Sequence, residues 1–350
     1  MPRIVFERST LPAMSAIEIG LGGDLGEYWS MPLRQRIPAL RAELATFDPA
    51  AHIDFLVGLP AADEAREAAD LGTPYRMCGD LYVVPGDHRR PPAIQALRAD
   101  LARAQSSGTV DTIVMQVDGD RGRPTTAELV AFYREAYALA DAHGVRLDTE
   151  THIDRWTYDP RRVVEVDRAL RNELGRGLTV CADFSHYVHQ IGNTQASNWS
   201  AITVGDLVID PNQAGDIVTT GIITPGLVRS GHMRCAVPNE LPRGQGSIQY
   251  PLCNPDADPQ QKEPVGSLKH YGAWRAERTQ AWQMLYQRTF AAQIAARGAP
   301  VARFASEFIC VEDEYRMDSY RNVYQNLAAV AWACRAVQAL SHPATFTAKG

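Results

Sequence analysis

The chain has few of the features that mark secreted, membrane-bound or nucleic-acid-binding proteins. Its six cysteines form no Cys-x-x-Cys pair, and several lie in apolar runs, as reduced core thiols do. The first residues do not resemble a signal peptide, and no apolar run approaches the roughly 20 residues that span a membrane. No block of like charge accompanies the net charge of −6, although a nucleic-acid surface normally needs a basic stripe. We therefore expect a cytoplasmic protein with neither a membrane nor a nucleic-acid partner.

Internal repeats and low-complexity tails are also missing, and strand-like runs instead alternate with helix-like runs. The hydrophobic share of 45% over 350 residues is enough for a substantial core. The apolar patterns predict eight strands, at 16–21, 52–57, 81–84, 112–117, 145–150, 178–183, 231–237 and 301–309. They predict helices at 32–47, 61–71, 92–104, 125–143, 160–174 and 319–340.

This rhythm predicts an α/β fold, a (β/α)8 TIM barrel formed by residues 1–350 as a single domain. Two stretches interrupt it, 190–229 after the sixth strand and 238–268 after the seventh. Loops that follow barrel strands lie over the mouth of the barrel. We expect these two insertions to cover the mouth or to pack on a partner subunit, so a homo-oligomer is an open alternative.

Two carboxylates stand at the ends of neighbouring predicted strands. Glu150 ends the fifth strand and Asp183 ends the sixth, with a helical stretch between them. Because the carboxyl ends of parallel strands face the same crevice, both carboxylates are expected side by side there. His152 and His186 follow them closely in the sequence. Two carboxylates with two imidazoles predict a divalent-metal site or an acid/base site.

Other residues extend this candidate site. Glu307 ends the apolar run of the eighth predicted strand, and Gln116 lies at the end of the fourth, where its side chain can point into the mouth. Trp156 follows Glu150 and is a candidate to cover the ring of a substrate, with packing in the core as the alternative. His152 is a substrate-binding candidate, although orienting Glu150 or capping the next helix would explain it equally well.

Four short motifs in order resemble those of the xylose-isomerase-like TIM barrels, in particular the members of sugar phosphate isomerase/epimerase type. The motifs are Glu150-Thr-His, Asp183-Phe-Ser-His, Gly231-His-Met-Arg and Ser306-Glu-Phe. The resemblance covers roughly residues 140 to 315. The superfamily contains sugar isomerases, sugar epimerases, inosose dehydratases and endonuclease IV.

The resemblance implies one divalent metal ion, Mn, Mg, Co or Zn, among the last four strands. Its ligands would be Glu150, Asp183, His232 and Glu307. Such an ion polarises a carbonyl next to a hydroxyl. Glu150 and Glu307 would then move a proton off and onto carbon, and His186 would bind a substrate oxygen or the metal.

The sequence departs from this pattern at the seventh strand. The usual ligand is the second histidine of a His-x-His motif, and here Arg234 stands at that position. Arginine stays protonated and does not bind a metal ion. Three alternatives follow: His232 takes the ligand role after a change of register, the metal is held weakly by the carboxylates and His186, or Arg234 replaces the metal and polarises the substrate itself. We expect the guanidinium of Arg234 to lie near the three acidic residues and the substrate.

The resemblance implies an isomerase or epimerase that acts on a sugar or a related polyhydroxylated carbonyl compound. A lyase or dehydratase is a close alternative, because it begins with removal of the same proton. A barrel without metal that binds a ligand or a partner protein is the alternative from a different class.

Overall fold

The computed structural model describes residues 17–84, 91–119, 123–153, 155–191, 209–213, 215–238, 249–260, 273–296, 298–309 and 319–341. Eight parallel strands pair in sequence order and close into a barrel, because β8 pairs with β1. The strands are β1 (Ile17–Leu21), β2 (Phe55–Val57), β3 (Tyr75–Val83), β4 (Thr112–Asp118), β5 (Arg146–Glu150), β6 (Val180–Ala182), β7 (Val228–Met233) and β8 (Ala302–Ser306). The (β/α)8 barrel predicted from the sequence is confirmed.

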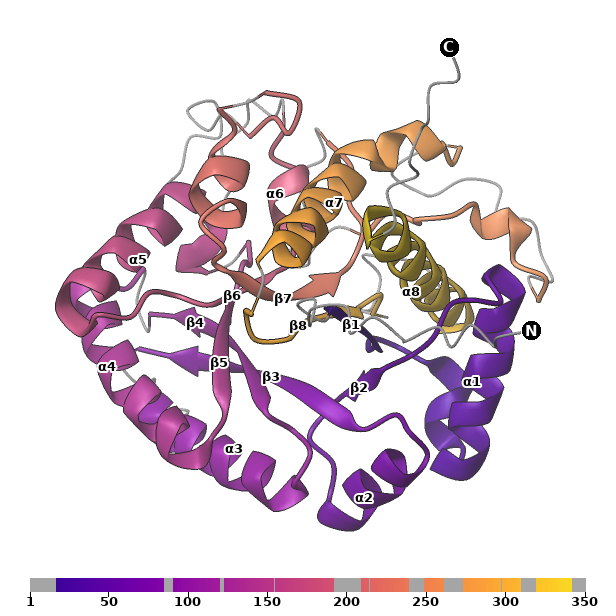
Figure 1. The fold of residues 1–350 in the computed structure, drawn as a ribbon, viewed down its shortest axis with the longest axis horizontal. Coiled ribbons are helices and arrows are strands. Elements are labelled where there is room, and N and C mark those ends of the chain that lie inside the picture. Colours follow the sequence, from indigo (N-terminus) through magenta and orange to yellow (C-terminus); the bar gives the residue numbers. More distant parts are fainter. Residues whose placement is uncertain are drawn as a thin grey trace, which may run out of the picture.

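Helices surround the strands and form the outer layer (Figure 1). They are α1 (Leu33–Phe47), α2 (Ala62–Asp70), α3 (Ala93–Ser107), α4 (Thr126–His143), α5 (Pro160–Leu174), α6 (Ser185–Val188), α7 (Gln280–Ala295) and α8 (Ser319–Ser341). Short helical turns join them, namely η1 (Gly26–Ser30), η2 (Trp156–Tyr158), η4 (Thr219–Ile223), η5 (Pro255–Ala257) and η6 (Ala276–Thr279). Among the described helices, none is long and apolar enough to cross a membrane.

Local sequence explains where several of these helices begin and end. Thr125 caps α4 in a capping box with Glu128, and Gly144 ends the helix with φ of 67°, a left-handed conformation that glycine adopts without strain. Asp159 caps α5 and Pro160 occupies its first turn, where the missing N–H costs nothing. These two helices flank β5 and so fix the strand that carries Glu150.

The core has two parts, as the geometry of a closed barrel requires. A small cluster fills the interior of the barrel and consists of buried side chains from alternating strand positions, Phe55, Met77, Val114, Cys181 and Ala305. The larger part lies between the strands and the helices. Because the interior is packed with side chains, only the two ends of the barrel are free to hold polar groups.

The amino ends of the strands hold one group of charges. Asp148 is fully buried, and its carboxylate accepts hydrogen bonds from Arg146 at 3.0 Å and Ser230 at 2.6 Å. Arg303 binds Glu18 at 2.7 Å and also Asp111. These charges are paired with one another, which is typical of the stability face of such a barrel.

Some expected boundaries were wrong. β3 begins at Tyr75, six residues before the predicted start at 81, and β7 spans Val228–Met233 and not 231–237. The insertion expected at 190–229 therefore ends within β7 and contains η4. Residues 192–208, 239–248 and 261–268 of the two insertions lie outside the described residues.

Helix α7 was missed, although its sequence carries a signal. Trp282, Leu285, Tyr286 and Phe290 recur at helical spacing and are all fully buried. The Pro- and Gly-rich segment before α7 obscured this pattern. Tyr286 matters for the site, because its hydroxyl lies 2.7 Å from the Ala182 carbonyl and 2.5 Å from the His232 carbonyl. It therefore ties the ends of β6 and β7 together.

Close packing of β7 predicts the effect of a single methyl group. A Cβ added to Gly231 would lie 2.9 Å from the Ala182 carbonyl and 2.7 Å from the Phe304 ring. We expect Gly231→Ala to lower the free energy of unfolding by about 1–3 kcal/mol, the usual cost of overpacking. Chemical denaturation measures this, with Gly215→Ala as the control because nothing described lies within 4 Å of its added Cβ. Equal stability of the two variants would contradict the packing described for β7.

Candidate active site

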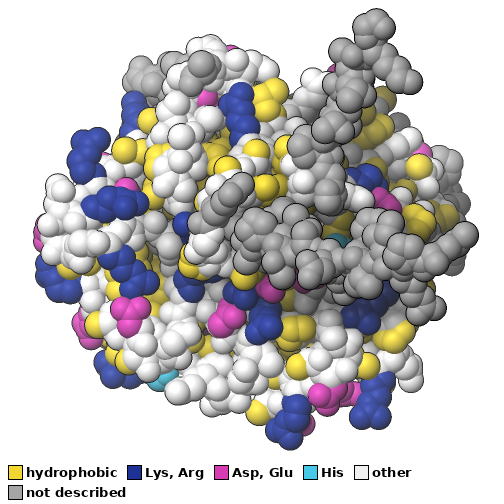
Figure 2. Space-filling model, in the orientation of Figure 1, with side chains coloured by type: hydrophobic (Ala, Val, Ile, Leu, Met, Phe, Trp, Pro, Cys, Tyr) yellow, Lys and Arg dark blue, Asp and Glu magenta, His cyan; other side chains and the backbone are white. Residues whose placement is uncertain are grey.

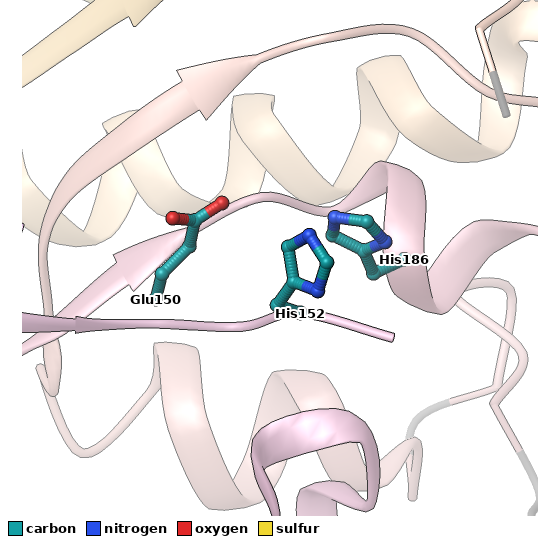
Figure 3. A group of neighbouring side chains, drawn as sticks. All are labelled: Glu150, His152 and His186. Carbon is teal, nitrogen blue, oxygen red and sulfur yellow. The ribbon is translucent and has the colours of Figure 1, made fainter. Parts of the chain in front are cut away.

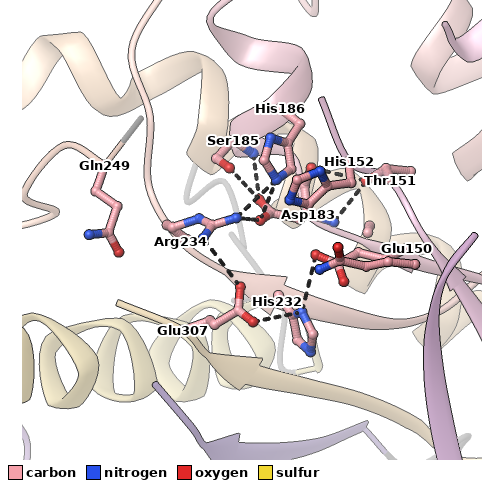
Figure 4. A network of polar contacts seen from close by, with 12 residues as sticks. Glu150, Thr151, His152, Asp183, Ser185, His186, His232, Arg234, Gln249 and Glu307 are labelled. Carbon is pink, nitrogen blue, oxygen red and sulfur yellow. Dashed lines mark hydrogen bonds and ion pairs between the residues drawn. The ribbon is translucent and has the colours of Figure 1, made fainter. Parts of the chain in front are cut away.

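The candidate site lies at the carboxyl end of the barrel, where polar side chains follow β5, β6, β7 and β8. Figure 4 shows Glu150, Asp183, His232, Arg234 and Glu307 converging there. Three of them are almost fully buried, with exposed fractions of 2% for Glu150, 0% for Asp183 and 2% for Arg234. Glu307 is more accessible, with 23% of its side chain exposed. The sequence analysis named all five, and the structure brings them together.

His232 lies between two carboxylates. Its Nδ1 atom is 3.1 Å from Oε1 of Glu307 and 3.6 Å from Oε1 of Glu150. Burial alone would lower the pKa of His232, but the two carboxylates outweigh that effect and raise the pKa to about 9. The same neighbour acts on Glu150, where burial would raise the pKa and His232 brings it below its ordinary value. Without a bound cation, His232 is therefore an imidazolium that compensates the charge of Glu150.

Glu307 behaves differently from Glu150. Burial raises its pKa to about 7, although His232 and Arg234 beside it act in the opposite direction. A carboxyl group with this pKa is present in both protonation states near neutral pH. Gln249 fixes the chain just beyond it, because its side-chain amide exchanges two 2.8 Å hydrogen bonds with the backbone of Ile309. Sequence reasoning did not identify this role of Gln249.

Asp183 is bound by its neighbours on both carboxylate oxygens. Oδ1 accepts hydrogen bonds from the backbone N–H of Ser185 at 2.9 Å and from its hydroxyl at 2.5 Å. Oδ2 accepts from Nη2 of Arg234, and His186 Nε2 is 3.3 Å away. Burial would raise the pKa of Asp183, but Arg234, His186 and Ser185 together bring it far below its ordinary value. Asp183 is therefore ionised throughout the physiological range.

We had expected Arg234 to lie within the seventh strand, but it directly follows Met233, the last residue of β7. Its guanidinium points toward the acidic residues, as predicted, and away from the helix layer. Besides Asp183, Nη2 contacts His186 Nε2 at 2.9 Å, and Nη1 lies 3.7 Å from Oε2 of Glu307.

His152 and His186 lie side by side next to Glu150 (Figure 3). Their ring centroids are 4.1 Å apart. Burial, together with the nearby His186, Arg155 and Arg234, lowers the pKa of His152 well below its ordinary value, so this imidazole is neutral. Thr157 holds the backbone here, because its hydroxyl donates to the Glu150 carbonyl at 2.7 Å and accepts from the His152 N–H at 3.0 Å.

Thr151 is a second residue that sequence reasoning missed. Its hydroxyl donates to the Asp183 carbonyl at 3.0 Å and accepts from the Asp183 N–H at 2.9 Å. It therefore fixes the end of β6 against the end of β5. A threonine after the strand-end glutamate was the available signal, but threonine is too common at strand ends to identify the role.

A cavity of about 530 Å³ opens beside these residues on the side of β2, β3 and β4. Glu150, His232, Glu307 and Gln116 line it. Asp80, Asp100 and Arg103 line it as well. Arg155 donates to the Gln116 side chain at 3.1 Å. Trp156, by contrast, is fully buried in η2 and is not among the residues that line the cavity.

Two groups of three side chains have the donor types and spacing of a metal site. They are Glu150, His152 and His186, and Glu150, His232 and Glu307, and within each group the candidate ligand atoms lie within 4.8 Å of one another. Two ligands at right angles, each about 2.1 Å from an ion, are about 3 Å apart, close to the separation of His232 Nδ1 and Glu307 Oε1. The second group therefore fits a divalent ion, whereas Asp183 is in neither group.

The surface around this end carries charges of both signs. Figure 2 shows Lys and Arg side chains interspersed with Asp and Glu over the visible described surface. No basic stripe is seen among these residues.

Comparisons with known proteins support the fold class. No protein-family model matches the chain, and no curated protein matches its sequence. A solved D-psicose 3-epimerase with D-tagatose from Clostridium cellulolyticum H10 aligns at a TM-score of 0.50 and 13% identity, over 92% of this chain and 99% of that one. Mannonate dehydratase from Streptococcus suis serotype 2 aligns at 0.50 and 10% identity, over 95% and 97% of the two chains.

A third solved structure carries the name of the fold. It is a fusion of a xylose isomerase-like TIM barrel with 4-hydroxyphenylpyruvate dioxygenase, aligned at a TM-score of 0.53 and 13% identity over 94% of this chain and 43% of the fusion chain. The protein is thus a TIM barrel. More particularly, the solved structures that share this barrel fold include a xylose isomerase-like TIM barrel, the kind of barrel that the four sequence motifs resemble.

The Arg234–Asp183 pair predicts a large loss of stability when one partner is removed. Arg234→Ala leaves a fully buried carboxylate without its cation, and we expect the free energy of unfolding to fall by about 3–5 kcal/mol at pH 7. Arg234→Lys, which keeps the charge, should lose less. Denaturant unfolding measures both variants.

The pH dependence of this loss follows from the lowered pKa of Asp183. A depressed carboxyl pKa contributes stability above its unfolded value of about 3.9, and this contribution disappears as the pH falls. The stability difference between wild type and Arg234→Ala should therefore shrink below about pH 4. A difference that stays constant into acid would show that Arg234 does not stabilise the ionised form of Asp183.

Proposed function

We propose that the protein is an isomerase or epimerase acting on a sugar or a related polyhydroxylated carbonyl compound. The observation that carries this proposal is that Glu150, His232 and Glu307 lie close together and line a cavity at the carboxyl end of the barrel. In barrels of this type, catalytic residues come from the ends of several strands at this face. The cavity has the size of a small-molecule site.

The two carboxylates supply the proton transfer. Glu150 has a lowered pKa and serves as the base that removes the proton from the carbon next to the carbonyl. Glu307 has a pKa near 7 and is suited both to give and to accept a proton. Returning the proton to the former carbonyl carbon, together with transfer of the hydroxyl proton to the former carbonyl oxygen, completes an isomerisation. Returning a proton to the opposite face of the original carbon completes an epimerisation.

Glu150, His232 and Glu307 would also hold a divalent ion; His232 would then be neutral, and the pKa values given above for Glu150 and Glu307 apply to the site without the ion. When bound, the ion supplies polarisation of the substrate carbonyl. Among the protein's own groups, Gln116 lines the cavity and would contact the substrate, whereas His152 and His186 lie beside Glu150 and are not among the residues that line the cavity. We infer that Trp156 is a packing residue, since it is buried away from the cavity.

Exchange of a carbon-bound proton with solvent tests this function. The purified protein is incubated with neutral ketoses and aldoses in D2O, with and without Mn2+, and NMR follows deuterium incorporation next to the carbonyl. We expect Glu150→Gln and Glu307→Gln to lower the exchange rate by about 10²–10⁴-fold, the usual contribution of a general acid or base. Glu165→Gln, a carboxylate on the outer surface of α5, is the matched control.

The products separate the alternatives. An epimer or an isomer supports the proposal, while a deoxy-keto product identifies a dehydratase that uses the same first step. Substrate binding without any exchange in the wild type would contradict the proposal and favour a binding barrel.

A further inference from the structure

The carboxylate of Asp183 has little capacity left for a metal ion. Its Oδ1 already accepts two hydrogen bonds from Ser185, and its Oδ2 accepts from the guanidinium of Arg234. A carboxylate oxygen accepts about two such bonds. Both Asp183 and Arg234 are also almost completely shielded from water. Moving Asp183 to an ion would take its nearest carboxylate away from the buried Arg234 and leave Glu307, at 3.7 Å, as the other acidic partner described.

The other three candidate ligands at the strand ends, Glu150, His232 and Glu307, form a group separate from Asp183. Nδ1 of His232 faces Oε1 of Glu307 and Oε1 of Glu150, and these residues line the cavity, whereas Asp183 and Arg234 are not among its lining residues. In Figure 4 the Asp183–Arg234–His186 contacts form one cluster and the Glu150–His232–Glu307 contacts another, joined where Arg234 reaches Glu307.

We propose that Asp183 is the counter-ion of Arg234 and not a metal ligand, so that a divalent cation is bound by Glu150, His232 and Glu307 alone. Arg234 is a positioning residue that holds Asp183 and lies 3.7 Å from Oε2 of Glu307 at the edge of the metal site. Its positive charge weakens the attraction between Glu307 and a cation. The proposal deepens the proposed function by assigning its ligands, but it is tested by binding and needs no substrate.

The sharpest test compares Asp183→Asn with Glu307→Gln. Isothermal titration with Mn2+ and the visible absorption of bound Co2+ report affinity and ligand geometry for the full-length protein after treatment with a chelator. We expect Asp183→Asn to change the Kd for Mn2+ by less than about threefold and Glu307→Gln to weaken it by at least about a hundredfold, because a hard cation needs charged oxygen ligands. If Asp183→Asn fails to fold, the double variant with Asp183→Asn and Arg234→Gln is used in its place, because it removes both charges of the buried pair.

Arg234→His gives a prediction of opposite sign. This change removes a competing cation, releases Asp183 and adds an imidazole, so Mn2+ should bind at least about tenfold more tightly than to the wild type. Arg288→His is the matched control, because the Arg288 guanidinium donates to Thr219 at 2.8 Å on the outside of the barrel. It should leave the affinity unchanged.

Each outcome decides the assignment. Loss of Mn2+ binding in Asp183→Asn would overturn it, because Asp183 would then be a ligand. Absence of Mn2+ binding in both the wild type and Arg234→His would overturn it too, because the three-residue group would not be a metal site. A failed search for substrate turnover, by contrast, contradicts only the proposed function and leaves these binding results in force.

Discussion

The need to neutralise three carboxylates that share one end of a barrel governs this structure. Parallel strands deliver Glu150, Asp183 and Glu307 to the same edge, and two of them are nearly inaccessible to water. Buried anions are tolerated only when cations and hydrogen bonds accompany them. Arg234 meets this need for Asp183, and His232 meets it for Glu150 and Glu307.

The pairing divides the mouth into two halves with different roles. On the side of β6 and the end of β7, Asp183, Arg234 and His186 are bound to one another and do not line the cavity. On the other side the cavity extends along β2, β3 and β4. The group of Glu150, His232 and Glu307 lies at the boundary, so it combines a fixed electrostatic environment with access for a ligand, the combination that catalysis requires.

The sequence predicted correctly the features that follow from the regular alternation of strands and helices. Alternation of strands and helices gives the barrel, and a polar residue after each apolar run gives Glu150, Asp183 and Glu307, since parallel strands must end together. Tertiary contacts decided the rest. The bonds of Thr151 to Asp183 and of Tyr286 to the carbonyls of β6 and β7 join segments that are distant in the sequence. No local pattern encodes such partners, so these supporting residues were missed.

Arg234 shows how one different residue in a motif can change the roles of the residues around it. Protons and a metal ion would compete for a histidine at this position. Arginine, by contrast, is permanently charged and brings a planar set of donors. On the proposed assignment, Arg234 next to Asp183 takes this carboxylate away from an ion and makes it a counter-ion. The number of carboxylates at the barrel mouth would then overstate the number that are available to bind metal. The ligands proposed here, Glu150, His232 and Glu307, line the cavity, whereas Asp183 does not.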